Sequence, residues 1–406
     1  MSIWEKVRKK VFFPWEKGKN FFPEVKNERG EKTKIFVGVS GGVDSSVSAL
    51  ILKEKGYDVH GVFFRKFNPD KNKCKKEKED AEKICEQLNI PFHFLDLEEE
   101  YKEKILSYFI ETYKSGKTPN PDIFCNRDIK FGAFQKWAFE SGADYIATGH
   151  YGKNIFNKKT NLFELHKGQD ENKDQSYFLA MLGQGQLAKS IFPLGGLKKP
   201  QVRKIAEKNN LITAGKKDSQ GICFLGEKID LKEFLKNYIP EKKGKVLDVK
   251  GREIGNHDGT VFYTIGERHG FEIFPKAKTP DMPRLFVIKK DEKKNTLIVG
   301  SAEELKNINS LALKNEIIFS HSSWISEEPD FSKKYLGRVR YRGELISAKL
   351  SYFGPQTICR AEVCVEDEIL NERVLATFEK NHRFIASGQV VVFYDGEKCL
   401  GGGIME

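Results

Sequence analysis

Apolar positions follow two different periods along the first half of the chain, and this predicts alternating strands and helices. A short apolar run at 35–39 ends in glycine and serine, and apolar residues then recur at helical spacing between 43 and 51. Because strands separated by helices pair in parallel, the pattern predicts a doubly wound α/β domain. The strands expected in this half are Ile35–Val39, Tyr57–Phe64, Pro91–Leu97 and Tyr145–Thr148.

After about Glu227 the pattern becomes mixed, and from about Asn309 it is a series of short strands with little helix. Strands at such spacing are typical of a small β-barrel or sandwich. The expected strands are Ile317–Phe319, Tyr335–Tyr341, Ser347–Tyr352, Thr357–Val365 and Val390–Tyr394. The chain is therefore divided into an N-terminal extension (1–32), an α/β domain (33–230), a small mixed central domain (231–303) and a C-terminal β-barrel (304–406).

Charge and cysteine usage narrow the class of protein. Sixty-nine Lys and Arg residues against 58 Asp and Glu give a net charge of +11, which fits a polyanionic partner such as a nucleic acid. No run of about 18 apolar residues occurs, so no membrane-spanning helix is expected. The seven cysteines are odd in number, follow no secretory signal and include no C-x-x-C pair. This pattern favours free thiols in the cytoplasm and assigns no metal site.

The sharpest local motif is S-G-G-V-D-S-S at Ser40–Ser46, directly after a predicted strand and before a predicted helix. Its glycines allow close approach of the backbone, and N–H groups at a helix start bind anions. The plain alternative is a capped Gly-Ser turn. The loop lacks the lysine of a P-loop. It resembles instead the pyrophosphate loop of the N-type ATP pyrophosphatases, which transfer AMP from ATP to a substrate oxygen.

Two cysteines lie in loops rather than on an apolar face. Cys125 follows the two prolines of T-P-N-P-D, which end any preceding helix, and Cys223 lies in the Gly-bounded stretch 218–227. Cys85, on an apolar stripe, is expected in the core. Two loop cysteines in an ATP-activating protein suggest that one carries a persulfide sulfur and the other resolves the resulting sulfur bridge.

Several further blocks extend the resemblance to the tRNA-specific 2-thiouridylases of bacteria and organelles, in family order from about Lys34 to Glu406. The blocks are T-P-N-P-D-x-x-C-N-x-x-I-K-F, A-T-G-H-Y, N-K-D-Q-S-Y-F-L, D-S-Q-G-I-C-F, H-D-G-T-V-F-Y-T-I-G-E-R-H-G, R-V-R-Y-R and V-F-Y-D-G-E-K-C-L-G-G-G-I. Two departures occur. Phe64 stands where the family usually has methionine, and 271–278 lacks the usual Gly-rich continuation.

The resemblance implies a set of site residues. Cys223 would carry the persulfide, Cys125 would resolve the intermediate, and Asp122 would act as acid or base. ATP would be bound by Gly38, Val39, Ser40, Gly41, Gly42, Val43, Asp44, Ser45, Phe64 and Gly149. The tRNA would meet Asn120, Pro121, Asp122, Lys173, Asp174, Gln175, Arg340 and Tyr341.

The resemblance also implies the reaction. ATP with Mg²⁺ would adenylate the C2 oxygen of the wobble uridine, U34, and persulfide sulfur would then replace that oxygen and release AMP. The expected partners are the tRNAs for Lys, Glu and Gln and a cysteine desulfurase or sulfur-relay protein, with the chain itself a monomer. An iron–sulfur cluster on the cysteines is the open alternative to a persulfide. Two other classes, an ATP pyrophosphatase that does not act on RNA and an inactive binding protein, fit the cysteine pair less well.

Overall fold

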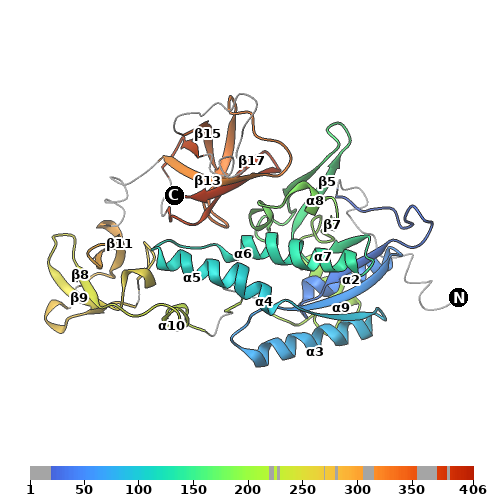
Figure 1. Ribbon diagram of the computed structural model, residues 1–406, viewed down its shortest axis with the longest axis horizontal. Helices are drawn as coiled ribbons and strands as arrows, with labels where there is room; N and C mark the ends of the chain where they lie inside the picture. Colours follow the sequence, from blue (N-terminus) through green and yellow to red (C-terminus); the bar gives the residue numbers. More distant parts are fainter. Residues whose placement is uncertain are drawn as a thin grey trace.

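The computed structural model describes residues 20–218, 224–225, 229–268, 270–278, 282–304, 315–353, 373–381 and 385–406. These residues form a helix-covered parallel sheet, a small central sheet and a β-barrel (Figure 1). The expected class, an α/β domain followed by a mixed central domain and a C-terminal β-barrel, is confirmed. Among the described residues, no helix combines the length and the apolar character that crossing a bilayer requires.

The first domain is built on five parallel strands in the order β3-β2-β1-β4-β7. The central strand β1 has the apolar sequence KIFVG because helices and neighbouring strands bury it on both faces. The strands are β1 (Lys34–Gly38), β2 (Asp58–Arg65), β3 (Phe92–Asp96), β4 (Tyr145–Ala147) and β7 (Ser190–Ile191). The helices are α2 (Val43–Glu54), α3 (Lys71–Gln87), α4 (Glu98–Tyr101), α5 (Ser107–Lys114), α6 (Pro121–Phe124), α7 (Phe134–Glu140), α8 (Gln184–Leu187) and α9 (Lys199–Lys208), with the π-helices η2 (Lys102–Leu106) and η3 (Cys125–Ala133) and the 3₁₀ turn η4 (Ser176–Leu179).

The direction of strand order reverses between β1 and β4. The chain first builds outward from β1 through β2 to β3, and then places β4 on the other side of β1. Ligands of open parallel sheets bind outside the carboxyl ends of the strands at such a reversal. The segments that follow β1 and β4 therefore frame the expected ligand site.

The central domain is a second five-stranded sheet in the order β10-β9-β8-β12-β11. It follows α10 and begins where the alternating pattern of the first domain has ended. Its elements are α10 (Leu231–Lys236), β8 (Gly244–Leu247), β9 (Glu253–His257), η5 (Thr260–Phe262), β10 (Glu272–Ile273), η6 (Pro275–Ala277), β11 (Phe286–Asp291) and β12 (Thr296–Gly300).

The C-terminal strands close into a barrel because β13 pairs with both β16 and β18. Closure removes exposed edges from this sheet. The strands are β13 (Glu316–Trp324), β14 (Lys334–Arg338), β15 (Ile346–Tyr352), β16 (Val374–Phe378), β17 (Val390–Asp395) and β18 (Lys398–Met405). The strand predicted at Thr357–Val365 lies outside the described residues.

A hairpin of the first domain extends the barrel sheet. Strands β5 (Gly152–Asn157) and β6 (Leu162–Lys167) pair with each other, and Leu165 of β6 pairs with Cys399 of β18. A salt bridge of 3.1 Å between Lys398 and Glu164 reinforces this junction. The hairpin was not predicted from the sequence. It attaches the barrel directly to the domain that carries the ligand loop.

Candidate active site

The loop between β1 and α2 forms an anion cradle. Gly41 has a φ of +69°, a left-handed conformation that glycine adopts without strain. Ser45 Oγ accepts a hydrogen bond from Ser40 N at 3.1 Å and donates one to Gly42 O at 3.1 Å. The loop is thus fixed by its own side chains in front of the N-terminus of α2, the end of a helix that binds phosphate.

Close packing around this loop requires glycine at two positions. A Cβ on Gly149, after β4, would lie 2.9 Å from Asp44 C and from Ser45 N. A Cβ on Gly41 would lie 2.6 Å from Glu77 O of α3. The backbone segments after β1 and β4 therefore meet at the point where the strand order reverses.

A chain of ion pairs runs from the cradle to the segment that precedes Cys223. Lys199 Nζ lies 2.8 Å from both carboxylate oxygens of Asp44 and 2.8 Å from Asp218 Oδ1. Asp218 also pairs with Lys173 at 2.5 Å and with Arg203 at 2.7 Å. The Lys199 side chain is only 9% exposed, so these charges attract one another in a poorly solvated environment.

The protonation states of this chain follow from its partners. Burial would raise the pKa of the Asp218 carboxyl, but hydrogen bonds from Lys173 and Lys199 outweigh it and lower that pKa to about 2. Burial and the negative charge of Asp44 raise the pKa of Tyr151 far above its usual value, so its phenol donates a hydrogen bond of 2.7 Å to Asp44 Oδ1. The Asp218 carboxyl is therefore ionised at neutral pH, and the Tyr151 phenol keeps its proton.

Sequence analysis did not identify the lysines beside the cradle. Lys216 Nζ donates to Gly41 O at 2.7 Å and also pairs with Asp80, while Lys199 contacts Asp44 from the start of α9. Neither lysine belongs to a local motif, so only the tertiary fold brings them to the loop. Their ammonium groups place positive charge beside a loop that contains no lysine of its own.

Phe64 lies at the carboxyl end of β2, next to the cradle. Its ring stacks on Phe134 with centroids 5.2 Å apart. A Cβ on Gly38, the last residue of β1, would lie 3.2 Å from the Phe64 ring. The side chain that replaces the usual family methionine therefore covers the end of the strand that leads into the loop.

The expectation that Cys125 lies in a loop off the core is wrong, because the segment passes through two short helices and Cys125 belongs to the main core cluster. The second proline starts a helix here, a position at which proline is favoured. Pro121 begins α6, and η3 continues from Cys125, which is 1% exposed. Asn120 precedes α6 without capping it, and its Nδ2 donates to Gln389 Oε1 at 3.2 Å and to Tyr177 OH at 3.4 Å. The π-helix is a geometry that is often found at functional sites. Asp122 lies in the first turn of α6.

A buried histidine joins this helix to the loop after β4. Lys130 Nζ of η3 donates to His150 Nε2 at 3.3 Å, and His150 Nδ1 lies 2.7 Å from Thr148 Oγ1. Burial, together with the charge of Lys130, lowers the pKa of His150 well below its usual value. The neutral imidazole therefore accepts from Lys130 and donates to Thr148, a structural link between η3 and the neighbourhood of Gly149.

The residues expected to contact tRNA at 173–175 are engaged within the protein. Lys173 pairs with Asp218, and Gln175 Oε1 accepts from Tyr151 N at 3.0 Å. Asp174 is 4% exposed and accepts from the Gly168 and Ser176 amides at 3.0 and 3.1 Å.

Of the barrel residues expected to contact tRNA, Tyr341 packs on Phe178 with ring centroids 4.4 Å apart. It is half-buried and follows Arg340, which is exposed. These two residues therefore lie where the barrel meets the first domain, close to η4. RNA contact by 173–175 and by Arg340 and Tyr341 stays a prediction.

Cys223 lies outside the described residues, but both of its flanks are anchored. Asp218 is fixed by three cations, as described above. Phe224 is fully buried and packs on Phe109 of α5 with centroids 5.2 Å apart. On the other side, Phe124 next to Cys125 packs on Tyr108 of α5 at 4.5 Å. The neighbours of both cysteines thus contact consecutive residues of one helix.

Two of the other described cysteines, Cys85 and Cys399, are structural. Cys85 and Cys399 are fully buried, and burial raises the pKa of each thiol to about 12. The core position expected for Cys85 is confirmed, and its sulfur fills the space beside Gly61, where a Cβ would lie 2.2 Å away. Within the described residues, no three His, Cys, Asp or Glu side chains are grouped to hold a metal.

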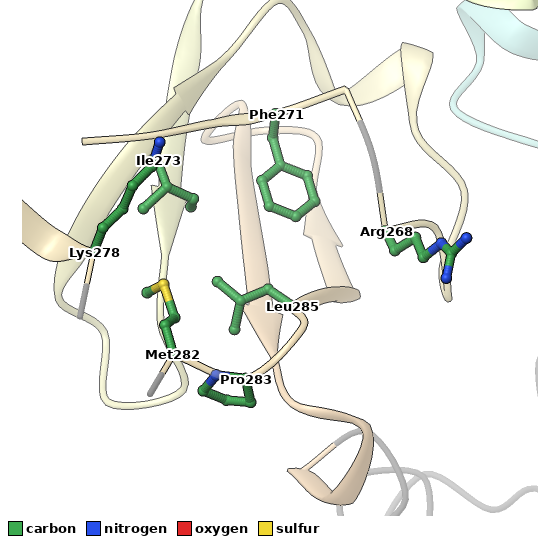
Figure 2. Close-up of a pocket in the computed structure, with 7 residues that line it drawn as sticks. All are labelled: Arg268, Phe271, Ile273, Lys278, Met282, Pro283 and Leu285. Carbon is green, nitrogen blue, oxygen red and sulfur yellow. The ribbon is translucent and has the colours of Figure 1, made fainter. Parts of the chain in front are cut away.

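A hollow of about 290 Å³ lies in the central domain, separate from the cradle. Figure 2 shows Phe271 and Leu285 directed toward its centre, with Arg268 at one side and Lys278 at the other. Its lining residues are Arg268, Phe271, Ile273, Lys278, Met282, Pro283 and Leu285. No residue of the cradle lines this hollow.

Comparison with known families covers nearly the whole chain. Residues 33–227 match the tRNA methyl transferase HUP domain and 232–301 the tRNA methyl transferase PRC-barrel domain. Residues 314–405 match the aminomethyltransferase beta-barrel domain. The three matches follow one another in the order of the three bodies seen in the structure.

Individual relatives are similar over their full length. A protein of Enterococcus faecalis named tRNA-specific 2-thiouridylase MnmA is 42% identical over 380 residues, covering 92% of this chain and 96% of the relative. A protein of the same name from Geobacillus thermodenitrificans is 41% identical over 385 residues, covering 94% and 96%. The solved U34-tRNA thiolase NcsA of Methanococcus maripaludis with its [4Fe-4S] cluster is 20% identical over 53% of this chain and 71% of that one. Its TM-score of 0.34 is too low to bear on the chemistry.

Proposed function

The chain belongs to the tRNA-specific 2-thiouridylase family, and from this premise we propose which of its residues bind ATP, meet the target base and carry the sulfur. Membership makes it an ATP-dependent tRNA sulfurtransferase. The proposal for the reaction is adenylation of the C2 oxygen of U34 with release of pyrophosphate, followed by replacement of that oxygen with sulfur. Adenylation is needed because a uracil oxygen is a poor leaving group, whereas AMP is a good one.

ATP is proposed to bind at the cradle, with its phosphates at Gly38–Ser45 and its base near Phe64 and Gly149. The fixed loop, the N-terminus of α2 and the lysines at 199 and 216 support this assignment. In this proposal their donors would face the charge that develops on the departing pyrophosphate. Fixed donors of this kind stabilise such a transition state without having to reorganise.

A magnesium ion fits this site in the manner common for nucleotide enzymes. Mg²⁺ in such sites is held by one or two carboxylates together with substrate phosphates. Asp44 supplies one carboxylate in the first turn of α2. When bound, the magnesium ion would neutralise phosphate charge.

The single observation that carries the sulfur chemistry is the common packing of both cysteine segments on α5. Phe124 and Phe224, the chain neighbours of Cys125 and Cys223, contact Tyr108 and Phe109. The persulfide on Cys223 attacks C2 with its terminal sulfur, and AMP leaves with the oxygen. The Cys125 thiolate then attacks Cys223 Sγ, which breaks the sulfur–sulfur bond and releases 2-thiouridine. A Cys125–Cys223 disulfide remains and must be reduced before the next turnover.

The target base is proposed to lie against Asn120–Asp122, one turn of chain before Cys125. Asp122 lies in the first turn of α6. We assign it as the general acid or general base that exchanges a proton with the uracil ring during adenylation. Lys173–Gln175, Arg340 and Tyr341 are proposed to contact tRNA, with the tRNAs for Lys, Glu and Gln as substrates. The sulfur donor is a cysteine desulfurase or a relay protein, and the enzyme works as a cytoplasmic monomer.

The proposal is tested by anaerobic thiolation of unmodified tRNA bearing U34, with ATP, Mg²⁺ and a desulfurase. Wild type, Cys125→Ala, Cys223→Ala and the control Cys74→Ala are compared for 2-thiouridine, AMP and pyrophosphate. Wild type and Cys74→Ala should form 2-thiouridine and AMP in step. Each site variant should stop thiolation, while Cys223→Ala still releases pyrophosphate.

Two results would contradict the assignment. Activity that appears only after iron–sulfur reconstitution would replace the persulfide with a cluster on the cysteines. Full thiolation by Cys125→Ala would remove that residue from the sulfur chemistry.

A further inference from the structure

We infer that Gln389 of the C-terminal barrel is a positioning residue for the segment that carries Asp122 and Cys125. The inference rests on the roles proposed above for those two residues. It makes the barrel a part of the active-site framework, and its basis is a set of hydrogen bonds between two segments more than 260 positions apart in the chain.

The Gln389 side chain contacts three consecutive residues of the segment. Its Nε2 donates to Pro119 O at 2.7 Å and to Thr118 O at 3.3 Å. Its Oε1 accepts from Asn120 Nδ2 at 3.2 Å. The Gln389 amide thus donates to two backbone carbonyls and accepts from one side-chain donor. These bonds fix the orientation of the amide and the position of residues 118–120.

Few hydrogen bonds within residues 118–121 can fix the conformation of this segment. Pro119 and Pro121 carry no N–H, so the loop cannot form the backbone hydrogen bonds that order most turns. The two backbone N–H groups of 118–120 also donate to residues outside the segment. Thr118 N donates to Ser387 O at 2.8 Å, and Asn120 N donates to Tyr108 OH at 3.3 Å. The barrel end at 387–389 therefore provides most of the polar contacts of 118–120.

Gln389 is itself firmly placed. Gly388 N donates to Met405 O at 2.8 Å, and Met405 N donates to Gln389 O at 2.8 Å. Gly388 has a φ of +88°, and a Cβ there would lie 2.8 Å from Thr118 O. The barrel backbone thus approaches the loop as closely as glycine permits, and Val390, the first residue of β17, is fully buried.

The start of α6 depends on these contacts. Asparagine is among the best N-cap residues, because its side-chain oxygen accepts from the first free N–H groups of the helix. Here Asn120 makes no such cap and directs its amide to Gln389 and Tyr177 instead. Tyr177 in turn donates to Val390 O at 2.8 Å. The barrel and η4 together therefore set the point from which α6 carries Asp122 and Cys125.

The test compares Gln389→Ala and the isosteric Gln389→Glu, which removes the Nε2 donor, with wild type. Gln87→Ala is the matched control, because the Gln87 amide also makes two hydrogen bonds, to Asn210 O at 2.7 Å and from Ile212 N at 3.2 Å, away from the loop. For both Gln389 variants kcat for 2-thiouridine should fall by at least about 10-fold. The KM for tRNA should remain within about 2-fold of wild type. The melting temperature should remain within about 3 °C of wild type.

A second measurement does not depend on turnover. Native-state alkylation with iodoacetamide, followed by mass spectrometry, reports how well Cys125 is held in its buried position. Gln389→Ala should accelerate labelling of Cys125 by about 10-fold, as expected for loss of ~1–1.5 kcal/mol of local stability. Cys85 labelling should not change, because that thiol lies in a different core cluster.

The outcomes separate this inference from the proposed function. If both Gln389 variants keep wild-type kcat and wild-type Cys125 labelling while Cys125→Ala is inactive, the positioning role is wrong and the cysteine mechanism stands. If Cys125→Ala is fully active, the proposed function is wrong, and faster Cys125 labelling would still show that Gln389 holds the loop. A fall in tRNA affinity at unchanged kcat would reassign Gln389 to substrate binding and overturn the inference.

Discussion

The ammonium group of Lys199 lies 2.8 Å from both carboxylate oxygens of Asp44, and it also lies 2.8 Å from Asp218 Oδ1. One buried cation thus joins the phosphate-binding loop to the segment that leads toward Cys223. A single side chain therefore connects the site proposed for nucleotide with the segment proposed to deliver sulfur.

Replacement of Lys199 by alanine should weaken both nucleotide binding and folding. Loss of this cation removes the positive charge between Asp44 and Asp218, while Asp218 keeps Lys173 and Arg203 as partners. Losing such a charged hydrogen bond should cost about 1–3 kcal/mol of stability. ATP affinity, measured by isothermal titration, should fall by at least about 10-fold. Lys204→Ala, an exposed lysine on the same helix α9, is the control and should match wild type. Unchanged ATP affinity in Lys199→Ala would exclude a role at the cradle.

A methyl group at Gly149 should disable the nucleotide loop. In Gly149→Ala the new Cβ would lie 2.9 Å from Asp44 C and Ser45 N, which are backbone atoms that cannot rotate away. We expect ATP-dependent pyrophosphate release to fall by about 100-fold, as for a misplaced catalytic group. Gly185→Ala is the matched control, because a Cβ there meets nothing within 4 Å. Equal activities of the two variants would mean that the loop adjusts freely.

The stability contributed by Asp218 should depend on pH in a defined direction. Its pKa in the folded protein is about 2, below its ordinary value of 3.8. Because the unfolded chain binds the proton more readily, this contribution is complete above about pH 4 and is lost as the pH falls toward 2. Urea unfolding should show Asp218→Asn to be less stable by about 2 kcal/mol at pH 7. The difference from wild type should shrink between pH 4 and pH 3; a constant difference would contradict the ion-pair origin.

The buried thiols of Cys85 and Cys399 should not react with alkylating reagents in the native protein. Burial raises the pKa of Cys85 and of Cys399 to about 12, so almost no reactive thiolate forms at neutral pH. In native protein treated with iodoacetamide, Cys74, which is half-buried at the surface of α3, should be alkylated well before either. Denaturation in urea should make all three react. Rapid native labelling of Cys399 would show that the barrel opens readily beside β6.

Local features of the sequence identified most of the catalytic domain. The expected strands agree with β1–β4 to within two residues. The run of buried apolar residues in β1 is characteristic of a central parallel strand. The cradle was found because its glycines and serines are adjacent in the chain. The hairpin β5–β6 was missed because its partner is β18, more than 230 positions away, and because its exposed positions disguise the strand pattern.

The sequence by itself determined the fold class, the family, the Gly-Ser motif after β1 and the proline-rich motif before Cys125. Each of these depends on neighbouring residues, whose spacing fixes their local geometry. Only the tertiary structure decided that Lys199 and Lys216 contact the cradle, that Phe124 and Phe224 pack on the same helix, and that Gln389 holds the segment before Cys125. These contacts join residues far apart in the chain, and they form because buried charges and amides must find partners wherever the fold brings them.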